Sequence, residues 1–323
     1  MNSKWLRRAT GLRLPLVLLA CLATGRAEEP SPAGPPTGPP LVVVLDSGVA
    51  ADHAVFHGRW LAASEVATRL PAGMTAAGAG EWPGWDFLEQ DAQPQDRTGH
   101  GTHVAGMVAD ALARGGKACA TVRLVMLRTG DGRQKLEDVT AAVAAVSAMR
   151  EAGWDIPVVL CAFEYRRNAA DEAAFVKFEQ AFRKLLESGV TCVCAAGNQG
   201  LDNDALAPET GEYPASFQAP AMIAVAACGN DGQLLATSNY GVAGVMLGAP
   251  GLAVRAAAIE GGSEERSGSS QAAAWVAGCL ARHAAETGER QPAAMRAWLL
   301  TQVKLHPSLV GRVASAGALV PAK

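Results

Sequence analysis

The sequence lacks the patterns that identify fibrous and disordered chains. Its 35 glycines follow no three-residue period and no long charged heptad run is present, which excludes a collagen-like chain and a coiled coil. Charged residues make up only 18% and hydrophobic residues 49%, whereas a disordered chain needs low hydrophobicity and a high net charge. With 323 residues, the chain is long enough for one large globular domain or two small ones.

Basic residues are not in excess either. The formal net charge is −3, but five basic residues and no acidic residue fall within the first 27 positions. Residues 28–323 therefore hold 23 basic and 31 acidic residues, which gives a formal charge of −8. Because binding to a phosphate backbone requires a basic surface, we expect no nucleic acid among the partners.

The apolar run near the N-terminus is shorter than the ~20 residues that a membrane-spanning helix needs. The run spans residues 14–23 and follows a basic stretch. The small residues Gly25 and Ala27 come after the run, with the spacing of a cleavage site. We interpret residues 1–27 as an export signal peptide, so that the mature chain has no transmembrane helix and is secreted or held in the cell envelope. A lipoprotein anchored through Cys21 is the second choice.

Proline and glycine are concentrated in residues 28–40, which favours an extended linker without a packed core. No later stretch of the sequence resembles a second linker. We therefore expect a single folded domain over residues 41–323, and we expect it to act as a monomer.

Short apolar runs in this domain are typical of strands that are buried on both faces. They span residues 41–45, 122–127, 158–162, 190–196 and 222–227. Apolar residues with helical spacing lie between the runs, at residues 136–149 and 175–185. The alternation predicts an α/β fold with a doubly wound, mostly parallel sheet and helices on both faces. Ligands of such sheets bind beyond the carboxyl ends of the strands, so the residues that follow each run are candidates for a functional site.

Four polar residues stand at such positions or at the start of helices. Asp46 follows the first run and Asn198 follows the fourth, where each by itself is typical of an ordinary turn. His100 lies between two glycines at the start of a predicted helix, which suggests that its ring approaches another group closely. Ser270 begins an alanine-rich helix, where serine is also a common N-cap. The four together favour a catalytic site.

A metal site is the other interpretation of the histidine motif, because His100 and His103 are spaced i, i+3. No H-E-x-x-H motif and no acidic third ligand at a suitable spacing accompany them. We therefore favour a catalytic role for His100 and assign no metal ligand.

The order Asp46, His100, Ser270 and the residues around them resemble the subtilisin-like serine protease (subtilase) family. The likeness extends from residue 41 to the C-terminus and includes Gly84-Trp85-Asp86-Phe87, Tyr213-Pro214-Ala215, Ser238-Asn239-Tyr240-Gly241 and Ala249-Pro250-Gly251. It implies the subtilisin-like form of the fold and a serine endopeptidase that acts on peptides or proteins through an acyl-enzyme on Ser270. His100 would be the general base and acid, Asp46 its orienting partner and Asn198 an oxyanion donor.

The segment Cys161-Ala162-Phe163 departs from the family, which normally has Ser-Leu-Gly there. We call it the specificity segment, because the family lines its primary specificity pocket with this stretch. The resemblance makes these three the substrate-binding residues. Phe163 is expected to narrow the specificity pocket or to force the substrate onto a different path. Glu164 allows two interpretations, a preference for a basic side chain or an exposed surface acid. Substrate specificity is therefore not carried over.

The resemblance also sets expectations for cofactors and folding. Val55 stands where many relatives have a calcium-binding Asp, so we expect no cofactor; calcium at other acidic groups stays open, without an assignable site. Between Ala27 and Leu41 there is no room for the propeptide that is common in secreted relatives. The domain is expected to fold unaided or with a separate partner.

Six cysteines follow the predicted signal peptide: Cys119, Cys161, Cys192, Cys194, Cys228 and Cys279. Export permits disulfides, but buried free thiols are equally compatible with the sequence. Cys192 and Cys194 share one face of a predicted strand and are not expected to pair with each other, whereas Cys161 on a neighbouring strand is within reach of either.

Two other functions compete with this interpretation. A catalytically weak or inactive subtilase-fold protein that binds or scaffolds is the alternative, because the specificity segment is altered; the retained triad argues against it. An esterase of the α/β-hydrolase type is excluded, since it needs G-x-S-x-G and the order Ser, Asp, His. Here Ala272 stands two residues after Ser270, and the order is reversed.

Overall fold

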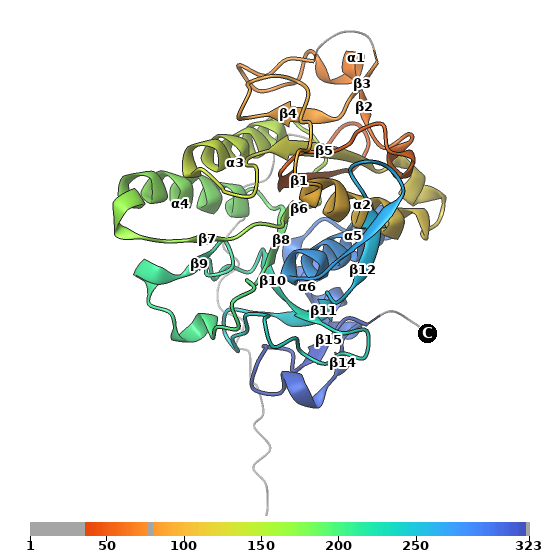
Figure 1. The fold of residues 1–323 in the computed structure, drawn as a ribbon. Coiled ribbons are helices and arrows are strands. Elements are labelled where there is room, and N and C mark those ends of the chain that lie inside the picture. Colours follow the sequence, from red (N-terminus) through yellow and green to blue (C-terminus); the bar gives the residue numbers. More distant parts are fainter. Residues whose placement is uncertain (1–35, 77–79, 321–323) are drawn as a thin grey trace, which may run out of the picture. The chain divides into compact units, whose positions relative to one another are not determined.

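The computed structural model describes residues 36–76 and 80–320, and its centre is a nine-stranded sheet (Figure 1). The strand order is β14-β15-β11-β10-β8-β6-β1-β5-β4. In chain order these strands are β1 (Leu41–Asp46), β4 (Gly84–Asp86), β5 (Arg123–Arg128), β6 (Val158–Cys161), β8 (Thr191–Ala195), β10 (Met222–Cys228), β11 (Leu247–Pro250), β14 (Lys304–Leu305) and β15 (Gly317–Ala318). Only the β14–β15 pair is antiparallel among them.

The remaining described strands form three two-stranded antiparallel pairs. They are β2 (Leu61–Ala62) with β3 (Glu81–Trp82), β7 (Tyr165–Arg166) with β9 (Glu212–Tyr213), and β12 (Val254–Ala257) with β13 (Ser263–Arg266). The α-helices are α1 (Ala63–Val66), α2 (His100–Ala113), α3 (Leu136–Glu151), α4 (Glu172–Glu187), α5 (Ser269–Thr287) and α6 (Pro292–Thr301).

Helices cover both faces of the sheet, with α2 and α5 on one side and α3 and α4 on the other (Figure 1). Strand β1 shows why its sequence is apolar throughout. Val42 and Val44 belong to the core cluster with α2 and α5, while Val43 and Leu45 belong to the cluster with α3 and α4. Successive side chains of a strand point to opposite faces, so a strand covered on both faces needs no polar position. The predicted fold class is confirmed.

Because the strands are parallel, the carboxyl ends of three neighbouring strands lie side by side. Strands β8, β6 and β1 are adjacent in the sheet and point in the same direction. Asp46 ends β1, Ala162 follows β6 and Asn198 lies shortly after β8. The sheet topology therefore brings together residues that are more than 100 positions apart in the sequence.

The last residues of the predicted linker lie against the domain. The backbone N–H of Thr37 donates to the carbonyl of Gly153 at 2.9 Å, and the N–H of Arg123 donates to the carbonyl of Pro40 at 2.9 Å. The predicted export signal, with Cys21, lies outside the described residues. Within residues 36–76 and 80–320, no helix combines the length and apolar character that a membrane span requires.

All six cysteines of the described region are free thiols. Cys161, Cys192 and Cys194 are fully buried in the core cluster that faces α3 and α4, on the neighbouring strands β6 and β8. Burial raises the pKa of all three thiols well above the ordinary value, so they remain protonated in this setting. We interpret them as core side chains.

Candidate active site

Asp46 and His100 are in direct contact at the carboxyl end of β1. Nδ1 of His100 lies 2.7 Å from Oδ1 of Asp46, whose side chain is 3% exposed, against 32% for His100. The negative charge of Asp46 raises the pKa of His100, and burial of the ring opposes this effect. Because a carboxylate only accepts hydrogen bonds, the neutral imidazole donates through Nδ1 and keeps its lone pair on Nε2.

Two glycines let the start of α2 lie against the end of β1. Gly99 has a φ of +78°, in the left-handed region that favours glycine. A Cβ atom at Gly101 would lie 2.1 Å from the carbonyl oxygen of Gly48, so a larger residue there would push the helix away. The glycines beside His100 are thus explained by its close approach to Asp46.

The buried carboxylate of Asp96 holds the first turn of α2. It accepts hydrogen bonds from the backbone N–H groups of Thr98, Gly99 and Thr102, and from the hydroxyls of Ser47 and Thr102. Free N–H groups at a helix start favour such an anion. Burial alone would raise the pKa of Asp96, but these hydrogen bonds lower it below the ordinary value.

Ser270 is the second residue of α5 and is 8% exposed. Its hydroxyl donates to the carbonyl oxygen of Ala162 at 2.8 Å, and within the described residues no hydrogen bond joins it to His100. The structure therefore unites Asp46 and His100 but directs the Ser270 hydroxyl to the segment after β6. Rotation about a single bond, between Cα and Cβ of Ser270, changes that direction.

Asn198 lies exposed beside the start of α5. Its Oδ1 accepts the backbone N–H of Ser269 at 2.8 Å, and because only an oxygen accepts from this N–H, the orientation of the amide is fixed. The side-chain Nδ2 is thereby left as a donor, for which the described part of the chain supplies no hydrogen-bond partner. Asn198 thus combines an anchored oxygen with a free N–H donor next to Ser270.

The family model described as Subtilase family matches residues 39–317. The chain belongs to the subtilase family. This confirms the resemblance that the order of Asp46, His100 and Ser270 indicated. A crystal structure of a cold-adapted subtilisin-like serine proteinase is similar in fold, with a TM-score of 0.67, 24% identity, and coverage of 88% of this chain and 89% of that chain.

Curated relatives match with low identity. Alkaline serine exoprotease A of Vibrio alginolyticus is 27% identical over 265 residues, which cover 80% of this chain and 41% of the relative. Subtilisin-like protease 1 of Pseudogymnoascus destructans is 29% identical over 258 residues, which cover 79% of this chain and 54% of the relative. This subtilase chain therefore spans about half the length of the curated relatives it matches.

The specificity segment divides between two faces of the sheet. Cys161 and Phe163 are buried in the core cluster with α3 and α4, whereas Ala162 belongs to the cluster with α2 and α5. It is the Ala162 carbonyl, rather than a side chain, that meets Ser270. Substrate binding by Cys161, Ala162 and Phe163 stays a prediction.

Sequence reasoning missed two residues beside this segment. Gln199 donates from Nε2 to Oε1 of Glu164 at 2.6 Å and so bridges the loops that follow β6 and β8. Glu212, at the start of β9, has a buried side chain that is 3% exposed. Neither stands in a motif of its own, but Gln199 is next to Asn198, and Glu212 directly precedes Tyr213-Pro214-Ala215, which was part of the resemblance.

His103 is not paired with His100 at a metal site. Its ring is buried, and Nε2 contacts the carbonyl oxygen of Val254 at 3.0 Å. Burial lowers the pKa of His103, which fits a neutral core histidine. In residues 36–76 and 80–320, no group of three or more His, Cys, Asp or Glu side chains is arranged to hold a metal ion.

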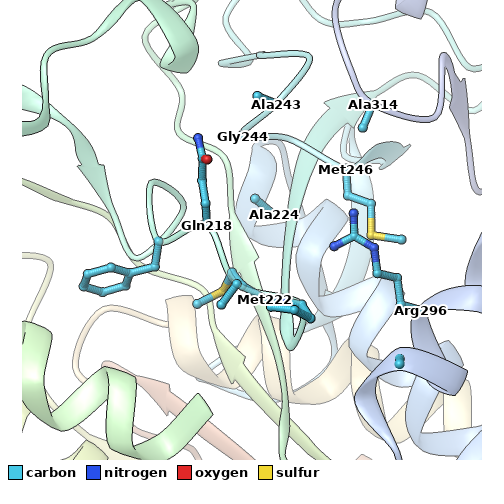
Figure 2. Close-up of a pocket in the computed structure, with 12 residues that line it drawn as sticks. Gln218, Met222, Ala224, Ala243, Gly244, Met246, Arg296 and Ala314 are labelled. Carbon is cyan, nitrogen blue, oxygen red and sulfur yellow. The ribbon is translucent and has the colours of Figure 1, made fainter. Parts of the chain in front are cut away.

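A cavity of about 450 Å³ lies at the amino ends of β10 and β11. Figure 2 shows residues that line it. Met222 and Met246 line it where β10 and β11 begin, and Arg296 of α6 closes one side. None of the four predicted catalytic residues lines this cavity. The predicted residues Asp46 and Asn198 instead lie at the carboxyl ends of β1 and β8, where ligands of parallel sheets usually bind.

Proposed function

We propose that the protein is an exported serine endopeptidase that hydrolyses peptide bonds through an acyl-enzyme on Ser270. The contact of 2.7 Å between Asp46 and His100, in a subtilase-family chain with Ser270 at a neighbouring helix start, is the observation that carries the proposal. Peptides or proteins are the substrates, the enzyme acts as a monomer, and residues 1–27 direct its export.

His100 activates the nucleophile in this proposal. The hydroxyl of Ser270 turns from the Ala162 carbonyl to Nε2 of His100, which takes the proton as Oγ attacks the substrate carbonyl carbon. Asp46 keeps the imidazole oriented and stabilises the imidazolium ion. The C–N bond then breaks as Nε2 returns the proton to the leaving amine. Water next gives a proton to Nε2 and adds to the acyl carbon, and the bond to Oγ breaks as Nε2 returns that proton to Ser270.

Two donors stabilise the negative oxygen of the tetrahedral intermediate. One is Nδ2 of Asn198, whose Oδ1 is anchored on the Ser269 N–H. The other is the backbone N–H of Ser270, which lies in the first turn of α5 and has no partner within the helix. Donors that are already oriented cost no reorganisation during the reaction, so they lower the barrier efficiently.

One observation favours the alternative, a catalytically weak or inactive binding protein. The Ser270 hydroxyl is hydrogen-bonded to Ala162 and must give up this bond before it can react. Loss of such a bond costs about 1 kcal/mol, which a reactive site can supply on substrate binding. We therefore place the peptidase first.

A fluorophosphonate probe separates the two functions, because it labels only an activated serine. The chain from Glu28 onward is compared with Ser270→Ala and with His100→Ala at equal concentrations of folded protein. We expect labelling and casein cleavage by the wild type alone. A folded wild-type protein that neither labels nor cleaves would favour the binding protein.

A further inference from the structure

Glu164 is linked to both loops that flank the nucleophile. It stands two residues after Ala162, whose carbonyl accepts the Ser270 hydroxyl, and its Oε1 accepts from Nε2 of Gln199 at 2.6 Å. Oε1 of Gln199 in turn accepts the backbone N–H of Asn198 at 3.1 Å. A single chain of hydrogen bonds therefore connects this carboxylate to the proposed oxyanion donor.

The second oxygen of Glu164 lacks a donor. Oε2 is buried and has no hydrogen-bond partner in the part of the chain that the structure describes. Burying a carboxylate oxygen without a donor is unfavourable, so the free energy of this group falls when an N–H of a ligand reaches it.

Glu212 is a second buried acid on this side of the molecule. Its side chain is 3% exposed, and within residues 36–76 and 80–320 its carboxylate accepts no hydrogen bond that meets normal geometry. Burial raises its pKa, and the negative charge of Glu164 raises it further. Glu164 directly precedes β7, whose Tyr165 is the register partner of Tyr213, the residue after Glu212, so the two acids are neighbours across this strand pair. Strands β7 and β9 fix this arrangement, since Arg166 of β7 is the register partner of Glu212 in β9.

Arg166 neutralises only part of the negative charge of Glu164 and Glu212. Its Nε lies 3.4 Å from Oε1 of Glu212, and its side chain is 53% exposed. Because more than half of the Arg166 side chain is exposed, water screens its charge, and the pairing is readily exchanged for another partner. The two carboxylates therefore share one guanidinium, at the strand pair that follows the Ala162 segment.

We propose that Glu164 and Glu212 bind the side chain on the acyl side of the cleaved bond and select lysine or arginine there. This inference rests on the proposed function, because the residue whose carbonyl meets Ser270 and Asn198 must place its side chain next to the two loops that carry Glu164 and Gln199. A guanidinium or ammonium group supplies the missing donors and removes the repulsion between the carboxylates. An apolar side chain would leave Oε2 of Glu164 without a donor and Glu212 with Arg166 alone.

The test uses peptides that differ only in the residue before the cleaved bond, which is Arg, Lys, Leu or Phe. For the wild type we expect kcat/KM to be at least about tenfold higher with Arg or Lys than with Leu or Phe. In Glu212→Gln and in Glu164→Gln the preference should fall by at least about tenfold, through lower values for the basic peptides only.

Glu187→Gln is the matched control, because it removes the same charge from an exposed position near the end of α4. Its preference should equal that of the wild type. Fluorophosphonate labelling of every variant reports the nucleophile independently of specificity, and thermal melting shows that the buried Glu212 variant is folded.

Labelled wild-type protein that cleaves the Leu or Phe peptide best, or that cleaves none of the four, would overturn the inference and leave the proposed nucleophile intact. An unchanged preference in both Gln variants would overturn it as well. Absence of labelling would instead contradict the proposed function itself.

Discussion

Asp46 accepts a hydrogen bond from Nδ1 of His100 at 2.7 Å, and it does so from a strand end where its own side chain is almost fully buried. Its other oxygen, Oδ2, is buried and has no hydrogen-bond partner among the described residues. Oδ1 also accepts the backbone N–H of Ser47 at 2.7 Å, so both hydrogen bonds of the carboxylate fall on one oxygen. The charge of Asp46 raises the pKa of the imidazole.

This relationship predicts the acidic limb of the pH profile. kcat/KM should fall as the pH is lowered through the pKa of His100, because an imidazolium cannot accept the Ser270 proton. The midpoint should lie above 6.5, the ordinary histidine value, and should move down in Asp46→Asn, with a loss in kcat of about 10⁴. Initial rates from about pH 5 to about pH 9 give the midpoint.

Asp52→Asn serves as the control for this profile, since Asp52 is an exposed acid six residues further along the chain. Its midpoint should match that of the wild type. An equal midpoint in Asp46→Asn would contradict the electrostatic role of Asp46.

The sequence pattern predicted much of the fold, because buried parallel strands must be apolar on both faces. All five apolar runs became strands of the sheet, and both helical segments became α3 and α4. Strand β11 was not predicted, since Leu247–Pro250 is short and contains Gly and Pro. Its strand conformation depends on pairing with β10 and β15, which are distant in the sequence.

The site was predictable to the extent that strand direction determines it. Asp46 and Asn198 follow parallel strands, so their common edge could be inferred without coordinates. The hydrogen bond from Ser270 to Ala162 could not, because a side-chain rotamer leaves no trace in the residue pattern. The proximity of Glu212 to Glu164 could not be predicted either, since it depends on the long-range pairing of two two-residue strands.

A buried ion pair next to β1 should be essential for stability. Arg128, at the end of β5, is 1% exposed and pairs with the equally buried Asp86, and its NH2 group lies 2.6 Å from Oδ1 of Asp131. Removing one partner leaves a buried charge, so Arg128→Met should lower the free energy of unfolding by about 3–5 kcal/mol. Urea unfolding measures the change.

Arg97→Met is the comparison for this variant, because Arg97 pairs with Glu89 while 54% of its side chain is exposed. Loss of an exposed pair should cost less than about 1 kcal/mol. Equal losses in the two variants would contradict the importance of the buried pair.

Asp96 should stabilise the start of α2 in a pH-dependent way. Its hydrogen bonds lower its pKa in the folded state, so its contribution is present above the ordinary value of 3.8 and is lost as the pH falls through the lower folded value. Asp96→Asn should therefore be less stable than the wild type by about 1–3 kcal/mol at pH 7, and the difference should shrink below pH 3.8.

Asp91→Asn provides the reference for the Asp96 measurement, because Asp91 is exposed and its carboxylate accepts a single hydrogen bond within the described part of the chain, from the Gln93 N–H at 2.8 Å. It should change stability by less than about 1 kcal/mol at either pH. A difference between Asp96→Asn and the wild type that stayed constant down to low pH would show that the charge of Asp96 is not what α2 requires.

Asn198 has two functions that a pair of variants can separate, since Oδ1 binds the Ser269 N–H while Nδ2 is the proposed oxyanion donor. Asn198→Ala removes both, and kcat should fall by about 10²–10³, the size of loss found when such a donor is removed from a related protease. KM should change little, because the oxyanion forms fully only in the transition state.

Asn198→Asp keeps an oxygen for the Ser269 N–H but replaces the donor with a negative charge. If the anchoring oxygen alone matters, this variant should retain both the melting temperature and kcat of the wild type. We expect instead that it keeps the melting temperature and loses at least as much kcat as Asn198→Ala, because a carboxylate repels the developing oxyanion. Turnover per labelled active site, measured beside thermal melting on the same preparation, distinguishes the two outcomes, and an unchanged kcat in both variants would remove Asn198 from the site.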